Sequence, residues 1–211
     1  MKDFGSYMLY YIICRFLKLF IIIMGGFKIV SLKNVPRKGG LILAPNHVSY
    51  LDPPAVGAGT PRHVHFMAKK ELFQPRLLGS VLRAVGSFPV SRGTADRKAI
   101  KRAIDLLEQG QVVCMFPEGT RSEDGKLGNA EVGVGLVALK SKVPVVPIAV
   151  IGTDTVLPVH GGLSRHPVKI VYGKPLTFPD LYEGRESREA MEEIGRRIMS
   201  AIAELQASHA S

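Results

Sequence analysis

The chain has 211 residues, of which 46% are hydrophobic and 22% are charged, so it can bury a full core in one domain and is not a disordered protein. Two cysteines, Cys14 and Cys114, exclude a disulfide framework and a cysteine-based zinc site, and they indicate a reducing compartment. The 28 Lys and Arg residues against 18 Asp and Glu residues give a net charge of +10, which favours an anionic partner such as lipid headgroups, a phosphorylated substrate or nucleic acid.

Residues 7–24 form an apolar run that is interrupted only by Arg15 and Lys18. As a helix the run would extend about 27 Å, slightly less than the ~30 Å hydrocarbon core of a bilayer. The two cations share one face, where each would cost about 2.5 to 3.5 kcal/mol at the bilayer centre. The pattern therefore predicts a helix that lies in the headgroup region rather than one that crosses the membrane. A buried core helix is the alternative, and a signal peptide is disfavoured because no small-x-small cleavage pattern follows the run.

A strand predicted at residues 41–44 leads into a short segment that carries His47 and Asp52. An imidazole beside a carboxylate can act as a general base whose orientation the acid holds. Five steps along a regular helix rotate a side chain by about 140°, so the pair requires a turn. The prolines at positions 45, 53 and 54 are expected to break regular structure on both sides of that turn.

Two other kinds of side chain were weighed as catalytic groups. Ser49 offers a covalent alternative to direct base catalysis, but it lacks the Gly-x-Ser-x-Gly setting of a serine nucleophile. The remaining histidines have no comparable carboxylate partner and are expected to be ordinary surface or loop residues: His63, His65, His160, His166 and His209.

Strands and helices alternate over the rest of the chain. Strands are predicted at residues 64–67, 87–90, 112–116 and 145–151, and helices at residues 71–85, 94–109 and 133–140. A long loop is expected at residues 153–167, and the apolar stripe of a closing helix comprises Met191, Ile194, Ile198, Ile202 and Leu205. This order predicts an α/β fold with a largely parallel central sheet flanked by helices, preceded by the N-terminal membrane-associating helix. Loops that follow the strands would then meet at the carboxyl edge of the sheet, where such sheets bind ligands.

Three further blocks accompany the His47 segment. They are GSFPVSRG at residues 86–93, FPEGTRS at residues 116–122 and VPVVPIAV at residues 143–150. Together and in this order, the four blocks resemble the glycerolipid acyltransferase family. The resemblance implies acyl transfer to an alcohol, with His47 and Asp52 in catalysis and the blocks at 86–93 and 116–122 in acceptor binding. The block at 143–150 reads as a buried strand that would line the acyl pocket.

A phosphorylated acceptor needs cations, and Arg92 and Arg121 are the candidates, because a guanidinium can bind phosphate through two parallel hydrogen bonds. Gly119 would allow a close backbone approach, while Glu118 could orient Arg121 or bind acceptor hydroxyls. The predicted acceptor site comprises Arg92, Glu118, Gly119, Thr120 and Arg121. Family members commonly have a basic residue just before the next helix, whereas this chain has Glu131, which argues against a further phosphate contact there.

The resemblance implies transfer of a fatty acyl group from acyl-CoA or acyl carrier protein to the sn-2 hydroxyl of 1-acyl-glycerol-3-phosphate, giving phosphatidic acid. No cofactor and no metal are expected; the expected partners are the lysophospholipid, the acyl donor and the cytoplasmic face of the cell membrane, and nucleic acid is not one. Residues 1–30 would form the membrane-associating segment and residues 31–211 the acyltransferase domain. One alternative keeps the chemistry with another acceptor: glycerol-3-phosphate, another lysophospholipid or a lyso-aminolipid. A non-enzymatic basic lipid-binding or nucleic-acid-binding protein is the other, and it leaves the His47 segment without a purpose.

Overall fold

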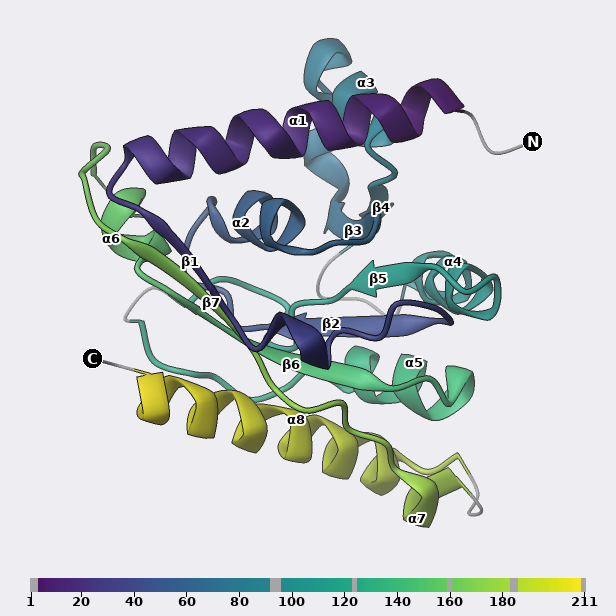
Figure 1. Cartoon of the computed structure of the whole chain (residues 1–211). Helices are drawn as coiled ribbons and strands as arrows, with labels where there is room; N and C mark the ends of the chain where they lie inside the picture. The colour runs from purple at the N-terminus through teal and green to yellow at the C-terminus, as the bar shows by residue number, and fades with distance from the viewer. Residues whose placement is uncertain (1–3, 92–95, 123–124, 159–160, 183–185, 210–211) are drawn as a thin grey trace.

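The computed structural model describes residues 4–91, 96–122, 125–158, 161–182 and 186–209. Within these residues, a sheet of seven strands lies between two layers of helices (Figure 1). The strands are β1 (Phe27–Val30), β2 (Leu41–Pro45), β3 (Val64–Lys69), β4 (Phe88–Val90), β5 (Val112–Cys114), β6 (Val145–Ile151) and β7 (Val168–Tyr172). The helices are α1 (Phe4–Ile23), α2 (Asp52–Gly59), α3 (Arg76–Ala84), α4 (Arg97–Glu108), α5 (Val132–Ser141), α6 (Thr153–Val156), α7 (Pro179–Tyr182) and α8 (Arg188–His209), with 3-10 turns η1 (Leu32–Asn34) and η2 (Lys70–Phe73).

The strands follow the order β1-β7-β6-β2-β5-β3-β4 across the sheet. Every neighbouring pair is parallel except β6 and β7, which run antiparallel. The prediction of an α/β fold with a largely parallel sheet is therefore confirmed. Because β6, β2, β5, β3 and β4 all point the same way, the loops that follow them lie at one edge of the sheet.

Alternate residues of β2 belong to different cores, as the pleat of a strand requires. Leu41 and Leu43 pack in the core beneath α1 and α2, whereas Ile42 and Ala44 pack in the core against α4, α5 and α8. All four side chains are fully buried. Burial on both faces explains why this strand reads as an unbroken apolar run.

Helix α1 lies over α2 with much of its apolar surface open (Figure 1). Tyr10 and Ile21 are buried, whereas Phe16 is 68% exposed and Ile12 is 45% exposed. The segment Gly5–Ile23 is long and apolar enough to cross a membrane, yet only 11% of it is buried inside the protein. An open apolar face of this size marks a membrane or partner surface, so α1 indicates membrane association. The alternative of a fully buried core helix is wrong.

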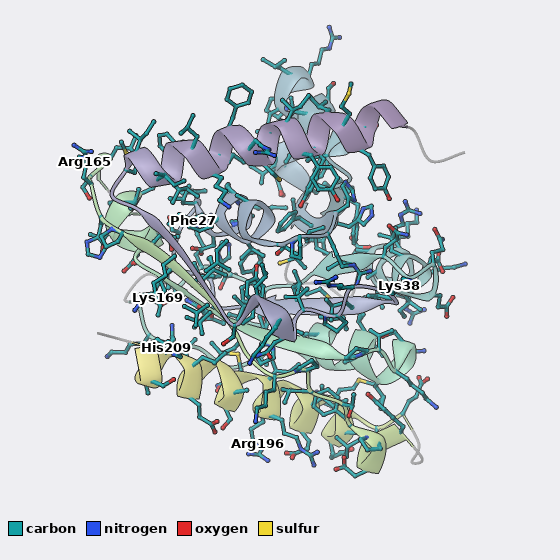
Figure 2. The ribbon with its side chains drawn as sticks, viewed as in Figure 1. Phe27, Lys38, Arg165, Lys169, Arg196 and His209 are labelled. Carbon is teal, nitrogen blue, oxygen red and sulfur yellow. The ribbon has the colours of Figure 1, made fainter. Side chains whose placement is uncertain are left out.

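Basic side chains bond the last carbonyls of both terminal helices (Figure 2). Arg165 donates to the carbonyl oxygen of Ile23 at 3.1 Å, at the end of α1. Lys169 Nζ donates to the carbonyl oxygen of His209 at 2.9 Å, at the end of α8. A cation is favourable at a helix C-terminus, where carbonyl groups lack partners within the helix. The segment around β7 thus holds both α1 and α8.

The structure differs from the predicted elements in several places. Strands β1 and β7 were not predicted, and the expected loop at residues 153–167 begins with α6. The helix predicted at residues 71–85 is η2 followed by α3, because Pro75 has no N–H to continue the first turn. Pro53 and Pro54 do not break regular structure; they lie in the first turn of α2, where helix N–H groups need no partner within the helix. The division at residue 30 stays a prediction, and β1 from the first segment pairs with β7 in the sheet.

Candidate active site

His47 lies in the loop that follows β2 at the carboxyl edge of the sheet. Asn46 holds the start of this loop to β6, since its side chain accepts a hydrogen bond from the Val150 N–H at 2.7 Å and donates to the Val150 carbonyl at 3.0 Å. Both partners are buried, so these bonds are not exchanged for bonds to water. The amide of Asn46 thereby extends the pairing of β2 with β6 by one residue.

Asp52 organises the turn that the His47 segment requires. Its Oδ2 accepts hydrogen bonds from the N–H groups of Val48 at 2.7 Å and Ser49 at 2.8 Å, and lies 2.7 Å from His47 Nδ1. His47 is 4% exposed and Asp52 is fully buried. The predicted side-chain pair is present in the structure, and the bonds to Val48 and Ser49 show how the turn brings it together. The contact with Asp52 directs Nδ1 inward and leaves Nε2 as the ring nitrogen for a substrate.

Thr153 supplies a fourth hydrogen bond to Asp52, which the sequence analysis did not find. Its hydroxyl donates to Asp52 Oδ1 at 2.6 Å, and Thr153 is fully buried. Gly152 makes this contact possible, because its φ of 84° turns the chain sharply between β6 and α6. A Cβ at Gly152 would lie 2.3 Å from the Pro167 carbonyl oxygen. The Gly-Thr pair directly after a buried strand is the signal that could have indicated this residue.

The loop after β5 holds the backbone of His47 on both sides. The carboxylate of Glu118 accepts the His47 N–H at 3.0 Å, and the His47 carbonyl accepts the Ser122 N–H at 2.8 Å. The ring of Phe116 stacks on the imidazole with ring centroids 4.0 Å apart. The predicted convergence of the His47 loop with residues 116–122 is therefore present.

Glu118 bonds the backbone of a second loop as well as that of His47. Its second oxygen accepts the Gly128 N–H at 3.0 Å, so the buried carboxylate joins two loops through their backbone. Gly119 has a φ of 69°, and a Cβ there would lie 2.7 Å from Glu131 Cγ. The Glu131 side chain therefore approaches the backbone of Gly119 closely, in the space that a Cβ would fill. A part for either residue in acceptor binding stays a prediction.

Arg121 lies beside the catalytic loop. Its guanidinium carbon is 3.6 Å from the centroid of the Tyr50 ring, and Tyr50 belongs to the loop between His47 and Asp52. Arg121 Nε is buried and has no hydrogen-bond partner among the described residues, so this N–H is available to an acceptor group. Thr120 is exposed next to it. Arg92 lies outside the described residues.

Ser49, His63 and His65 make structural contacts within the protein. Ser49 is fully buried, and its hydroxyl donates to the Leu157 carbonyl at 2.6 Å, so it is a structural residue of the turn. His63 is a loop residue, as expected, whereas the expectation that His65 is an ordinary surface or loop residue is wrong. His63 is buried with its ring 4.2 Å from that of Tyr10, and His65 lies in β3 with Nδ1 2.8 Å from the Gly86 carbonyl oxygen. Among the described residues, no group of three His, Cys, Asp or Glu side chains could hold a metal ion.

The fold and this site define an α/β enzyme that carries a buried histidine–aspartate base at the ligand-binding edge of a parallel sheet. The family model described as Acyltransferase matches residues 26–151. The chain therefore belongs to the acyltransferase family.

Known relatives agree with this family. The chain is 33% identical over 192 residues to the 1-acyl-sn-glycerol-3-phosphate acyltransferase of Bacillus subtilis (strain 168), which covers 90% of this chain and 93% of that protein. It is 32% identical over 166 residues to the protein of the same name from Streptococcus pneumoniae, over 78% of this chain and 60% of that protein. A solved structure, the 1-acyl-sn-glycerophosphate (LPA) acyltransferase PlsC from Thermotoga maritima, superimposes with a TM-score of 0.79 at 24% identity, over 98% of this chain and 84% of that one. At that identity the likeness to the solved structure concerns the fold.

Proposed function

We propose that this protein transfers a fatty acyl group from an acyl thioester to the sn-2 hydroxyl of 1-acyl-glycerol-3-phosphate, giving phosphatidic acid. The buried pair of His47 and Asp52, 2.7 Å apart at the carboxyl edge of the sheet, is the observation that carries the proposal. The named relatives support this acceptor, above all the Bacillus subtilis protein that matches over 90% of the chain. Acyl-CoA and acyl carrier protein are the two proposed donors.

The proposed reaction needs no covalent intermediate on the protein. His47 Nε2 takes the proton of the sn-2 hydroxyl, and the oxygen attacks the thioester carbonyl. Asp52 stabilises the imidazolium that forms and keeps the ring in place. When the carbon–sulfur bond breaks, the thiolate takes the proton from His47, so the base is restored without a cofactor or a metal.

Arg121 is proposed to hold the acceptor phosphate, and Arg92, which lies outside the described residues, is proposed to do the same. The contact of Arg121 with Tyr50 puts a cation beside the catalytic loop, and the buried Nε–H of Arg121 has no acceptor in the part of the chain that the structure describes. A phosphate accepts charge-assisted hydrogen bonds of this kind strongly. Glu118 and Gly119 support the acceptor site by fixing the loop that carries Thr120 and Arg121.

The proposed location is the cytoplasmic face of the cell membrane, with α1 in the headgroup layer. Arg15 and Lys18 would then meet lipid phosphates while the exposed apolar side chains of α1 insert. The two cysteines are free thiols, which suits a reducing compartment. In this position the acceptor is a component of the membrane, and the acyl donor arrives from solution.

Product analysis tests the proposal. Purified protein is incubated with 1-acyl-glycerol-3-phosphate and a labelled donor, acyl-CoA or acyl carrier protein in turn, and we expect labelled phosphatidic acid with one of them. His47→Ala and Asp52→Ala should lower the rate at least about a hundredfold, the usual contribution of a general base. The matched controls His166→Ala and Asp154→Ala change exposed residues outside the site and should retain the rate.

Two outcomes would contradict the proposal. Full activity of folded His47→Ala protein would rule out the proposed base. Transfer to glycerol-3-phosphate, another lysophospholipid or a lyso-aminolipid in preference to 1-acyl-glycerol-3-phosphate would keep the mechanism and replace the acceptor.

A further inference from the structure

The connection from β3 to β4 carries an unusually open set of apolar side chains. Leu77 in α3 is 82% exposed, the largest exposed fraction of any large apolar residue among those described, and Leu72, Leu78 and Val81 are each about 40% exposed. Val81 lies four positions after Leu77 and three positions after Leu78, so it borders both leucines on the surface of α3. We call these four residues the α3 apolar face.

The side of α3 that packs on the protein is small. Gly79 is its buried residue, and a Cβ there would lie 2.4 Å from the Phe73 carbonyl oxygen, so the helix rests closely on η2. Arg83 covers the Phe73 ring at 5.6 Å. The helix is therefore held firmly through one side while its leucines stay open. Apolar side chains that are held in contact with water cost free energy unless another surface covers them.

Positive charge surrounds the α3 apolar face. Residues 69–84 include four basic side chains, Lys69, Lys70, Arg76 and Arg83, against a single acidic one, Glu71. All of these side chains are exposed, and the contact of Lys69 with Glu71 is long at 3.9 Å. Leucines bordered by cations suit the boundary between headgroups and acyl chains of an anionic bilayer. A second copy of the chain fits poorly, because self-association would bring the two sets of cations together.

The α3 apolar face lies on the same side of the protein as the open face of α1. Helices α1 and α3 contact each other, and Figure 1 shows α3 rising beyond α1 on the side opposite α8. The two helices come from different parts of the chain and contact each other in the fold. Because β3 runs parallel to β5 and β5 to β2, the cations that begin η2 lie at the carboxyl edge of the sheet, the edge that also carries His47.

We propose that η2 and α3 form a second membrane-contacting element, which inserts Leu77, Leu78 and Val81 into an anionic bilayer beside α1. Two helices that touch the bilayer fix the orientation of the sheet, whereas a single helix leaves the protein free to rotate about its axis. The carboxyl edge is then held at the lipid surface. This inference concerns lipid contact and stands independently of the acyl transfer proposed above.

A single tryptophan tests the contact directly, because the natural chain has no tryptophan. Full-length Leu77→Trp protein is mixed with vesicles of phosphatidylglycerol and phosphatidylcholine. We expect its emission to shift to shorter wavelength and to be quenched by lipids brominated in the acyl chains. The control Leu32→Trp places the reporter in η1, which packs against β7, and its emission should not change.

A charge series tests the anionic preference. Each cation near an anionic surface contributes about a fivefold gain in binding, so Arg76→Gln should weaken sedimentation with anionic vesicles by about fivefold. Lys33→Gln in η1 is the matched control, and binding should be unchanged.

Three results would overturn the proposal. Leu77→Trp emission that does not respond while the protein sediments with vesicles would show docking through α1 alone. A blue-shifted emission before vesicles are added, together with a dimer in analytical ultracentrifugation, would show that a second copy covers α3. Equal binding of Arg76→Gln and natural protein to anionic vesicles would remove the charge argument. Acyl transfer to a short-chain acceptor in detergent is measured in parallel, so loss of lipid contact and loss of catalysis are distinguished.

Discussion

At the scale of single residues, Asp52 is the centre of the catalytic loop. One oxygen contacts the His47 ring and two backbone N–H groups, and the other accepts the hydroxyl of Thr153. A buried carboxylate is stable only where hydrogen-bond donors satisfy its oxygens. Thr153 is therefore a positioning residue, because it acts on His47 through Asp52.

Thr153→Val should lower kcat with little change in KM. The substitution keeps the volume of the side chain and removes a hydrogen bond to a charged group, worth about 1.5 to 3 kcal/mol, so we expect kcat to fall by about tenfold to a hundredfold. Steady-state kinetics with the acceptor varied gives the two parameters separately.

Thr153→Ser restores the hydroxyl and should recover most of kcat, whereas Thr155→Val, an exposed position in the same short helix, should have no effect. Equal activity of the valine and serine variants would show that Thr153 only fills space.

Tyr50→Ala should raise KM for the phosphorylated acceptor. The guanidinium carbon of Arg121 lies 3.6 Å from the centroid of the Tyr50 ring. A cation–π contact contributes about 0.5 to 2 kcal/mol, equivalent to about a twofold to thirtyfold change in KM. Tyr50→Phe keeps the ring and should behave as the natural protein does. An acceptor without phosphate serves as the internal control, and an equal rise in its KM would contradict a role through Arg121.

The residues of the site differ in how far the sequence could predict them. His47 and Asp52 are five positions apart, so a local pattern predicts their chemistry. Thr153 reaches Asp52 across 101 positions, and Tyr50 meets Arg121 only because β2 and β5 are neighbours in the sheet. Contacts of this kind depend on strand order, which no local pattern contains.

At the scale of elements, Asp96 ties the start of α4 to the end of β4. Its carboxylate accepts the N–H groups of Ser91 at 2.9 Å and Ala99 at 3.0 Å. These two backbone bonds lower the pKa of Asp96 because they favour its charged form. The residue is thus an N-cap that also fixes both ends of the segment containing Arg92.

Asp96→Ala should reduce the free energy of unfolding by about 1 kcal/mol, the usual contribution of an N-cap. Because the folded pKa is lowered, this contribution is complete above the unfolded value of about 3.9 and is lost as pH falls through the folded pKa. Urea unfolding at pH 7 and pH 3 checks both statements: the difference between the variant and the natural protein should be larger at pH 7. Asp105→Ala in the interior of α4 is the control, and a difference that does not depend on pH would contradict the capping role.

Elements with strong periodicity were predicted, and those that depend on tertiary pairing were not. The strands at residues 41–44 and 145–151 are apolar throughout because helices cover both of their faces. Strand β1 has only four residues and follows two glycines, so its run of apolar residues is too short to predict a strand. Its pairing with β7 is a contact that the local sequence does not contain. Helix α2 has two prolines in its first turn. In a sequence alone, two adjacent prolines indicate a helix start and a turn equally well.

At the scale of the whole molecule, α1 belongs both to the core and to the membrane surface. Ile21 is fully buried against the α2 side of the sheet, and the adjacent Ile22 is 47% exposed. One face of α1 therefore packs in the core, and the other face is open, as an interfacial helix requires. The two neighbouring isoleucines allow the two roles to be measured separately.

Ile21→Ala should lower the free energy of unfolding by about 2 to 5 kcal/mol, because it leaves a cavity in the core. Ile22→Ala should change that free energy by less than about 0.5 kcal/mol, as for most surface positions. It should instead weaken vesicle binding by about tenfold, since it removes three carbons that contribute about 0.8 kcal/mol each when a bilayer buries them fully, and only 47% of the side chain is open to the bilayer. Urea unfolding in detergent-free buffer and vesicle sedimentation give the two quantities for each variant. If both variants lost stability equally, α1 would be a core helix whose open face another part of the molecule covers. If both lost only vesicle binding, α1 would separate from the sheet and cross the bilayer, and the orientation of the catalytic edge would then depend on α3 alone.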